Sequence, residues 1–384
     1  MREILAGCAI AIVLSAATAT SEAATATLQR AWQFKEAQPA ALRLQNFIGD
    51  LRIERGESAG FHVSVTVTAE ADSDAGARSI AEAVEFRTSD AGASSSFEVV
   101  LPESTFPVLY HRGAPQGWFG TRMYADYLGE KRRVTGDAAE GVRVRVDILV
   151  RAPAGARLDA SNIFGESLAE GFAGELRLDG ASGRLASRRG EGRVELDSGS
   201  GEVEVTTHSG EVSADTGSGP VVIRDCRCRI SADTGSGSVT IEGGEGGIDV
   251  DTGSGGIAVK GFRGPVRADT GSGGVRATGL SGVSEFIADS GSGGVTASGD
   301  LSALRRLSID TGSGRVILES SAWPAMELVL DAGSGGVQVD VPGAEVRLDE
   351  DRRSVVRTGQ GGFRGHIDTG SGSISVRTTA ATAN

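Results

Sequence analysis

The stretch ISADTGSGSVTIE, residues 230–242, decides the fold because the pentapeptide in its middle recurs along the chain. Asp-Thr-Gly-Ser-Gly, with serine replacing threonine in some copies, occurs eight times, and Asp331 opens a ninth copy, DAGSG. The interval is 18 residues from Asp179 to Asp269, and the series continues at intervals of 18–21 residues to Asp368, with Asp349 as the member between Asp331 and Asp368. A fixed interval of this kind predicts a repeat architecture. The nine copies begin at Asp197, Asp215, Asp233, Asp251, Asp269, Asp289, Asp310, Asp331 and Asp368.

Short alternating segments lie on either side of each pentapeptide. Ile248 and Val250 alternate with an aspartate, and Ile257 and Val259 enclose an alanine. This period of two predicts strands with one face inward and one face outward. A single copy cannot bury its apolar face, whereas stacked copies can. The sequence therefore predicts an all-β fold, a parallel β-helix or β-solenoid with coils of 18–21 residues, and the usual crossover preference predicts a right-handed winding.

The pentapeptides are predicted to form sharp corners of the coils. Glycine tolerates the positive φ that such corners can require, and an aspartate side chain can accept a backbone N–H of its own turn. Aspartates stacked ~4.8 Å apart would repel one another by about 0.9 kcal/mol in water. Hydrogen bonds of ~1.5–3 kcal/mol to each carboxylate would outweigh that repulsion. We therefore expect the nine aspartates to have a structural role, each capping its own corner.

The same residues also occur in the catalytic loop of pepsin-like aspartic proteases. Those enzymes need two such loops facing each other so that two carboxylates share one proton, whereas copies on a periodic ladder predict turns. Calcium β-rolls place aspartate after the glycines, and here it precedes them. We find no nucleophile–base motif, and the four histidines are scattered. We expect no enzyme activity, cofactor or metal, with a carbohydrate-active enzyme on a β-helix scaffold as the alternative.

The net charge indicates which partners are unfavourable, and the first residues indicate the compartment of the protein. A formal net charge of −13 argues against nucleic acid, because binding phosphates takes clustered Lys and Arg. Residues 1–23 combine Arg2, an apolar run and small residues suited to cleavage, which predicts an export signal peptide. No later segment approaches the ~18 apolar residues of a membrane span. We expect an exported protein of the periplasm or cell surface.

Cys226 and Cys228 are the cysteines left after the signal peptide. Metal sites usually present four ligands, which disfavours metal binding by this pair. In an oxidising compartment the two can form a local disulfide. The sequence leaves open whether they are bonded or are an unbonded structural pair.

Pattern and composition divide the chain into segments. Residues 40–58 predict a first, detached coil, because LRLQNFIGDLRIERG shares its Leu-x-Leu and a glycine with LRLDGASGRL. Residues 59–152 lack the interval and predict an inserted β-rich region. Residues 153–378 predict the solenoid repeats, and residues 379–384 a disordered tail.

An aromatic-rich loop is predicted at residues 106–133. It holds six of the 18 aromatic residues (12 Phe, 3 Trp and 3 Tyr). Exposed Trp and Tyr favour interfaces, so one interpretation is a partner-binding loop. The other is a hydrophobic plug over the open end of the solenoid, where unpaired strand edges would aggregate. The candidate partner-binding residues are Trp118, Phe119, Tyr124 and Tyr127.

Several segments together resemble a known family. They are NFIGDLRIERG (46–56), VRVDILVRAPAGARLDASN (144–162) and the DTGSGSVTI ladder that follows. This combination resembles the "putative adhesin" family of exported bacterial β-strand-repeat proteins, a domain of unknown function, over roughly residues 40–378. The resemblance implies a β-solenoid at the cell envelope and supplies no catalytic residues. The aromatic loop is not part of that pattern.

These observations lead to one functional hypothesis and two alternatives. We expect a non-enzymatic, adhesin-like binding or structural module of the bacterial cell envelope, with an envelope glycan or protein as its partner. One alternative is the carbohydrate-active enzyme named above. The other is a self-assembling scaffold that associates through its terminal coils.

Overall fold

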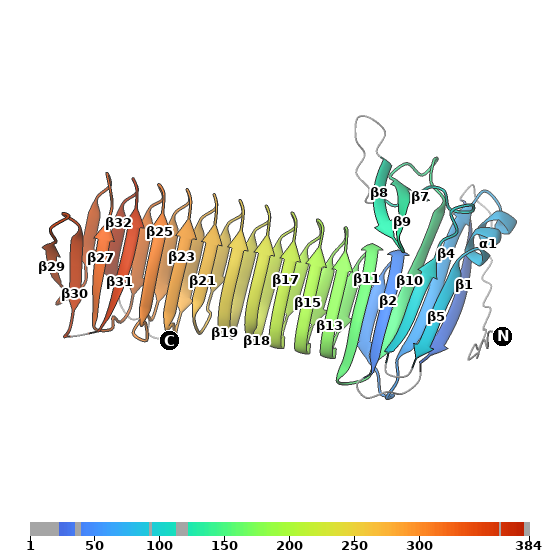
Figure 1. The fold of residues 1–384 in the computed structure, drawn as a ribbon, viewed down its shortest axis with the longest axis horizontal. Coiled ribbons are helices and arrows are strands. Elements are labelled where there is room, and N and C mark those ends of the chain that lie inside the picture. The colour runs from blue at the N-terminus through green and yellow to red at the C-terminus, as the bar shows by residue number, and fades with distance from the viewer. Residues whose placement is uncertain (1–22, 35–39, 92–93, 113–121, 361, 380–384) are drawn as a thin grey trace. The chain divides into compact units, whose positions relative to one another are not determined.

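The computed structural model describes residues 23–34, 40–91, 94–112, 122–360 and 362–379. The chain forms two compact units, of which the first ends at Gly201 and the second begins at Glu202. Apart from the helix α1 (Asp74–Glu82), the regular elements of the described part are strands (Figure 1). The all-β, solenoid-like fold class is therefore confirmed. No described helix has the length and apolar character needed to cross a membrane.

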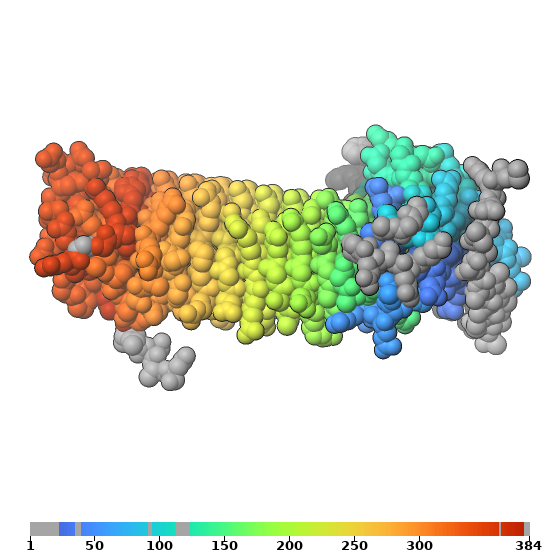
Figure 2. All heavy atoms as spheres, turned by 60° about the horizontal axis from the view of Figure 1, so that its bottom comes forward, coloured from blue at the N-terminus to red at the C-terminus, as the bar shows by residue number. Residues whose placement is uncertain are grey.

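The second unit is built from stacked parallel strands. Equivalent residues of successive coils pair directly, so that Asp233 lies beside Asp251 and Asp251 beside Asp269. The coil spacing is the 18–21 residues expected from the sequence. In Figure 2 side chains fill the spaces between these coils. The strands are β16 (Val203–Thr206), β17 (Ser209–Thr216), β18 (Val221–Thr234), β19 (Val239–Thr252), β20 (Ile257–Lys260), β21 (Val266–Thr270), β22 (Val275–Leu280), β23 (Glu285–Ser290), β24 (Val295–Gly299), β25 (Arg306–Thr311) and β26 (Val316–Ser320).

The core of this unit is a set of apolar rows that run from coil to coil. Ile230, Ile248 and Val266 form one row, and Val239 and Ile257 belong to another. All are buried, and full burial of such a side chain contributes about 1.5–3 kcal/mol. Branched aliphatic residues therefore supply most of these rows, and Phe286, which continues the first row beside Val266, is also fully buried.

A disulfide joins Cys226 and Cys228 within β18. Both cysteines are buried, and they lie beside Gly244 and Gly246 of the next coil. This answers the question that the sequence left open. These two glycines let the neighbouring backbones approach closely, because a Cβ at Gly246 would lie 2.0 Å from the Cys228 carbonyl oxygen and one at Gly244 would lie 2.2 Å from that of Cys226.

A threonine or serine hydroxyl, and not the aspartate, holds the pentapeptide corners. Thr234, Thr252 and Thr270 are fully buried. Each accepts the N–H of the glycine three residues on and donates to a glycine carbonyl of the neighbouring coil. The Thr252 hydroxyl lies 3.0 Å from Gly255 N and 3.1 Å from Gly237 O. One buried oxygen thus closes its own corner and also bonds that corner to the neighbouring coil.

Capping by each aspartate is therefore a wrong prediction for these corners. Strand alternation turns the threonine inward and the preceding aspartate outward, and Asp233, Asp251 and Asp289 lie exposed. The pKa of Asp289 is raised, first by the partial loss of hydration beside its neighbours and then by the charges of Asp269 and Asp310. Asp331 differs, because its Oδ1 accepts Gly333 N at 3.1 Å in the corner where Ala332 replaces threonine.

The corner glycines are needed for close backbone approach more than for positive φ. Neither Gly253 nor Gly255 has a positive φ. A Cβ would lie 2.5 Å from Gly235 O at the first and 1.7 Å from Gly237 O at the second. The backbone of the neighbouring coil leaves no space for a side chain there. Positive φ occurs in the DAGSG copy at Gly333 (50°) and at the looser corners, for example at Gly261 (65°).

The last coil of the chain is inserted between two earlier ones. The strands are β27 (Met326–Asp331), β28 (Val337–Asp340), β29 (Glu345–Leu348), β30 (Ser354–Thr358), β31 (Phe363–Thr369) and β32 (Ile374–Thr378). β31 pairs with β25 on one side and with β27 on the other. The spatial order is therefore Asp310, Asp368, Asp331, and not the sequential order that the interval predicted.

Asp349 is outside the ladder, which corrects a second expectation. It lies in the turn of the antiparallel hairpin β29–β30, where its Oδ1 accepts the N–H of Asp351 at 3.0 Å and of Arg353 at 2.9 Å. β30 also pairs antiparallel with β27. The hairpin thus covers an edge of the end coil, which would otherwise present an unpaired strand.

The first unit combines coils with a mixed region. β2 (Ala41–Ile48) and β3 (Leu51–Arg55) pair in parallel with β11 (Ala156–Phe164) and β12 (Ser167–Glu170). On their other side they pair in parallel with β6 (Ser94–Val100) and β10 (Arg143–Ala152). Antiparallel strands continue both sheets outward. The remaining strands are β1 (Ala24–Gln33), β4 (His62–Ala71), β5 (Glu85–Ala91), β7 (Leu109–Tyr110), β8 (Arg122–Tyr127), β9 (Glu130–Thr135), β13 (Ala173–Gly180), β14 (Leu185–Arg188) and β15 (Glu191–Ser198).

An aromatic cluster packs these outer strands together. The Trp32 ring of β1 lies 5.0 Å from Phe86 and 4.9 Å from Phe97, measured between ring centroids. The helix α1 packs on β1 and β4, and Ser73 caps its first turn by accepting Gly76 N.

The predicted signal peptide and tail fall almost wholly outside the described residues, which begin at 23 and end at 379. Thr379 donates its N–H to the Ser320 carbonyl at 3.0 Å.

Candidate functional site

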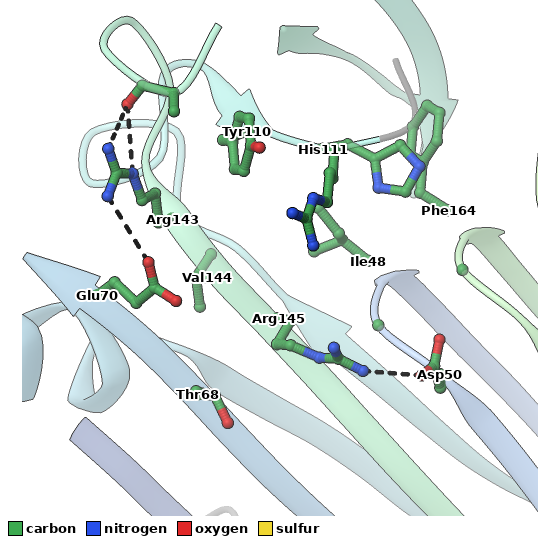
Figure 3. Close-up of a pocket in the computed structure, with 14 residues that line it drawn as sticks. Ile48, Asp50, Thr68, Glu70, Tyr110, His111, Arg143, Val144, Arg145 and Phe164 are labelled. Carbon is green, nitrogen blue, oxygen red and sulfur yellow. Dashed lines mark hydrogen bonds and ion pairs between the residues drawn. The ribbon is translucent and has the colours of Figure 1, made fainter. Parts of the chain in front are cut away.

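The first unit contains a pocket of about 560 Å³ (Figure 3). Its floor is the outer face of β10 and β4. One wall is the corner between β2 and β3 together with the end of β11, and the other is formed by residues 110–112 and Ala138. Five segments of the chain therefore meet in one hollow, namely 48–50, 68–70, 110–112, 138–145 and 164–165.

Two arginine side chains and one acidic side chain lie on the floor. The strand register puts Arg143 opposite Glu70 and Arg145 opposite Thr68, and Figure 3 shows these side chains on neighbouring strands. The Arg143 guanidinium donates to the Ala138 carbonyl at 3.3 Å and lies 3.7 Å from the Glu70 carboxylate. One arginine thus links the floor to the wall.

Arg145 links the floor to the glycine corner, which is the turn at Gly49 and Asp50 between β2 and β3. It lies 2.8 Å from the carboxylate of Asp50 and 2.6 Å from that of Asp147. The hydrogen bond to Asp147 is the main cause that raises the pKa of Arg145. Asp50 also accepts Glu166 N at 3.1 Å. The charges on this side of the pocket are therefore paired and held in place.

The corner itself is rigid because backbones approach closely. A Cβ at Gly49 would lie 2.1 Å from Val146 O, and one at Gly165 would lie 1.9 Å from Gly49 O. Below them Asn46 donates to Val146 O at 2.9 Å and to Asn162 Oδ1 at 3.0 Å. Both asparagines are fully buried. In these coils the asparagines occupy the position that threonine or serine has at the corners of the second unit.

Aromatic rings form the apolar part of the pocket. Tyr110, His111 and Phe164 line it, and the His111 and Phe164 rings lie 5.1 Å apart. Burial lowers the pKa of His111, although the charge of Asp50 opposes the change. The imidazole is therefore neutral near neutral pH, when it can both donate and accept a hydrogen bond.

The structure separates the predicted partner-binding residues. Trp118 and Phe119 lie outside the described residues. Tyr124 of β8 is 61% exposed and does not line the pocket. Tyr127 is buried, and its hydroxyl lies 2.6 Å from Val99 O and 3.0 Å from Gln45 O. Burial, followed by the charge of Glu98, raises the pKa of Tyr127.

Tyr127 therefore has a packing role, because its buried ring is out of reach of a partner. The ring lies 5.0 Å from Phe47, and so fixes β8 and β9 on the first unit. The pocket residues were not among the predicted sites. Alternation in VRVRVDILVR does place Arg143 and Arg145 on one outward face, but nothing in that pattern indicates what lies above it.

The pocket offers several groups that can orient a small ligand. Charged donors and acceptors lie beside aromatic rings, as in sites that orient a small ligand. Within the described ranges, no cluster of His, Cys, Asp or Glu has the makings of a metal site. The pocket thus combines charged groups and aromatic rings on a solenoid-like β-repeat protein.

The sequence model of the Toastrack DUF4097 family matches residues 183–377, and the chain belongs to this family of unknown function. This confirms the family resemblance. The pocket is formed by residues 48–165 and lies outside the matched region. No curated protein matches the chain. Among solved structures, it is similar to a protein described as a "putative cell adhesion protein" from Clostridium sporogenes, at 10% identity over 92% of this chain and 100% of the other, with a TM-score of 0.22.

Proposed function

We propose that the chain is an exported, non-enzymatic binding module of the bacterial cell envelope, and that its ligand site is the pocket of the first unit. The observation that carries this proposal is the meeting of aromatic rings with fixed polar groups in one hollow. The pocket lies outside the part matched by the family, so the ligand belongs to this chain's own mixed region. The signal-like residues 1–23 support export.

The chemistry of the pocket favours a saccharide of the cell envelope. Sugar hydroxyls donate and accept hydrogen bonds, and so match a site where arginines lie beside carboxylates. Arg143 faces Glu70, and Arg145 faces both Asp50 and Asp147. Three carboxylates thus balance the three arginines that line the pocket, Arg112 among them, and little excess positive charge is left for a multiply charged anion. The aromatic wall provides an apolar surface for a ring face.

A matched pair of tyrosine substitutions tests this proposal. Tyr110→Ala removes a pocket wall, whereas Tyr124→Ala removes an exposed ring elsewhere on the same insertion. On arrays of envelope glycans, we expect wild type and Tyr124→Ala to bind alike. We expect Tyr110→Ala to bind about two- to tenfold more weakly, because an aromatic contact contributes about 0.5–1.5 kcal/mol.

Three outcomes would count against the proposal. They are no binding on broad glycan arrays, equal loss in both tyrosine variants, and release of shortened glycan products. The last would support the alternative of a carbohydrate-active enzyme.

A further inference from the structure

Strand β29 is a free sheet edge at the C-terminal end of the second unit (Figure 1). It pairs with β30 on one side, and no described strand pairs with its other side. All four of its residues are exposed. Unpaired backbone N–H and C=O groups on such an edge can accept another strand.

The same strand carries exposed apolar surface. Val346 is 55% exposed and Leu348 66% exposed, and among the described large apolar side chains only Tyr124 is comparable. Val346 lies opposite Val356, which is fully buried. The apolar face that is buried at Val356 therefore continues onto β29, where it is exposed to solvent. Removing such surface from water is favourable.

The sequence of β29 is complementary to itself in one antiparallel register. Side chains alternate between faces, so Val346 and Leu348 share one face while Glu345 and Arg347 share the other. If two copies pair about a two-fold axis at Val346, Glu345 of each copy faces Arg347 of the other. Val346 then faces its own counterpart.

The other registers lack this match. An axis at Arg347 puts arginine against arginine and Glu345 against Asp349, and an axis at Glu345 puts glutamate against glutamate. Parallel pairing in phase also brings like charges together. A shift by one residue sets apolar against charged side chains. Opposite charges on facing strands stabilise and like charges destabilise.

We propose that two copies of this chain associate through β29, in an antiparallel pair centred on Val346. The occupant is a second copy because the charge pattern completes itself only across this two-fold axis, as an isologous interface requires. The association does not depend on the pocket or on its ligand.

Charge-swap variants of the full chain test the proposal by sedimentation. Wild type should form a concentration-dependent dimer. Glu345→Arg or Arg347→Glu alone makes both facing pairs repulsive, and each should raise the dimer dissociation constant about tenfold or more. An equimolar mixture of the two single variants should restore the dimer, because every facing pair then has opposite charges. Tyr110→Ala should dimerise like wild type.

A cysteine variant provides a second readout if a swap disturbs folding. Val346→Cys should give a disulfide-linked dimer under oxidation, because facing residues of antiparallel strands lie within bonding range. Leu348→Cys, which faces Ala344, should not. A wild type that stays monomeric at all concentrations overturns the proposal. So does a dimer that is unaffected by either swap, or a mixture of well-folded single variants that does not associate.

Discussion

At the scale of the residue, a buried hydroxyl joins the coils of the second unit at the corners that carry threonine or serine. The Thr252 oxygen is fully buried and serves Gly255 of its own corner and Gly237 of the next. The neighbouring Asp251 lies exposed. The conspicuous acidic residue of the pentapeptide is therefore on the surface, and the residue after it carries the structural hydrogen bonds.

Replacing this hydroxyl by a methyl group should destabilise the protein. Thr252→Val keeps the volume but leaves two buried backbone groups without a partner, each costing about 1–3 kcal/mol. We expect a loss of about 2 kcal/mol or more in the free energy of unfolding, measured with urea. Thr252→Ser, which keeps the hydroxyl, and Asp251→Asn should each change it by less than about 1 kcal/mol. A larger effect of Asp251→Asn than of Thr252→Val would contradict this account, because it would mean that the aspartate caps the corner.

Two adjacent glycines in one corner should differ sharply in their tolerance of alanine. A Cβ at Gly255 would lie 1.7 Å from Gly237 O, whereas one at Gly256 would lie 3.6 Å from Gly274 O. Gly255→Ala should therefore cost about 3 kcal/mol or prevent folding, since overpacking forces the backbone apart. Gly256→Ala should be close to neutral in thermal unfolding. Equal effects would mean that the coils are not stacked this closely.

At the scale of the element, the strand period is the feature that sequence predicts best. Alternation and a fixed interval are enough to place strands such as β19 and β21, because each coil repeats the same inward residues. The order of the last coils is different. Residues 326–340 and 363–378 carry the same pentapeptide pattern, so either can pair with 306–320. The hairpin β29–β30 decides between them by covering β27.

At the scale of the whole molecule, the fold could be predicted and the pocket could not. Every copy of a repeat adds evidence for the fold. Pocket residues such as Ile48, Tyr110 and Arg143, in contrast, come from separate segments with no shared interval. Two of the four aromatic candidates lie outside the described residues, and the buried Tyr127 shows why composition alone misleads. An aromatic-rich segment can use its rings to attach itself to the protein.

The central claim is that coils stack in the spatial order given by the strand register, and engineered disulfides test it most directly. Glu319 lies beside Arg377, and Asp340 lies on the far side of Arg377. Neighbouring strands are ~4.8 Å apart, within the Cα range of a disulfide, and next-nearest strands are not. The variant E319C/R377C should therefore cross-link under mild oxidation, and E319C/D340C should not. Ready cross-linking of E319C/D340C, with none in E319C/R377C, would mean that the coils follow one another in sequence order and would contradict the account.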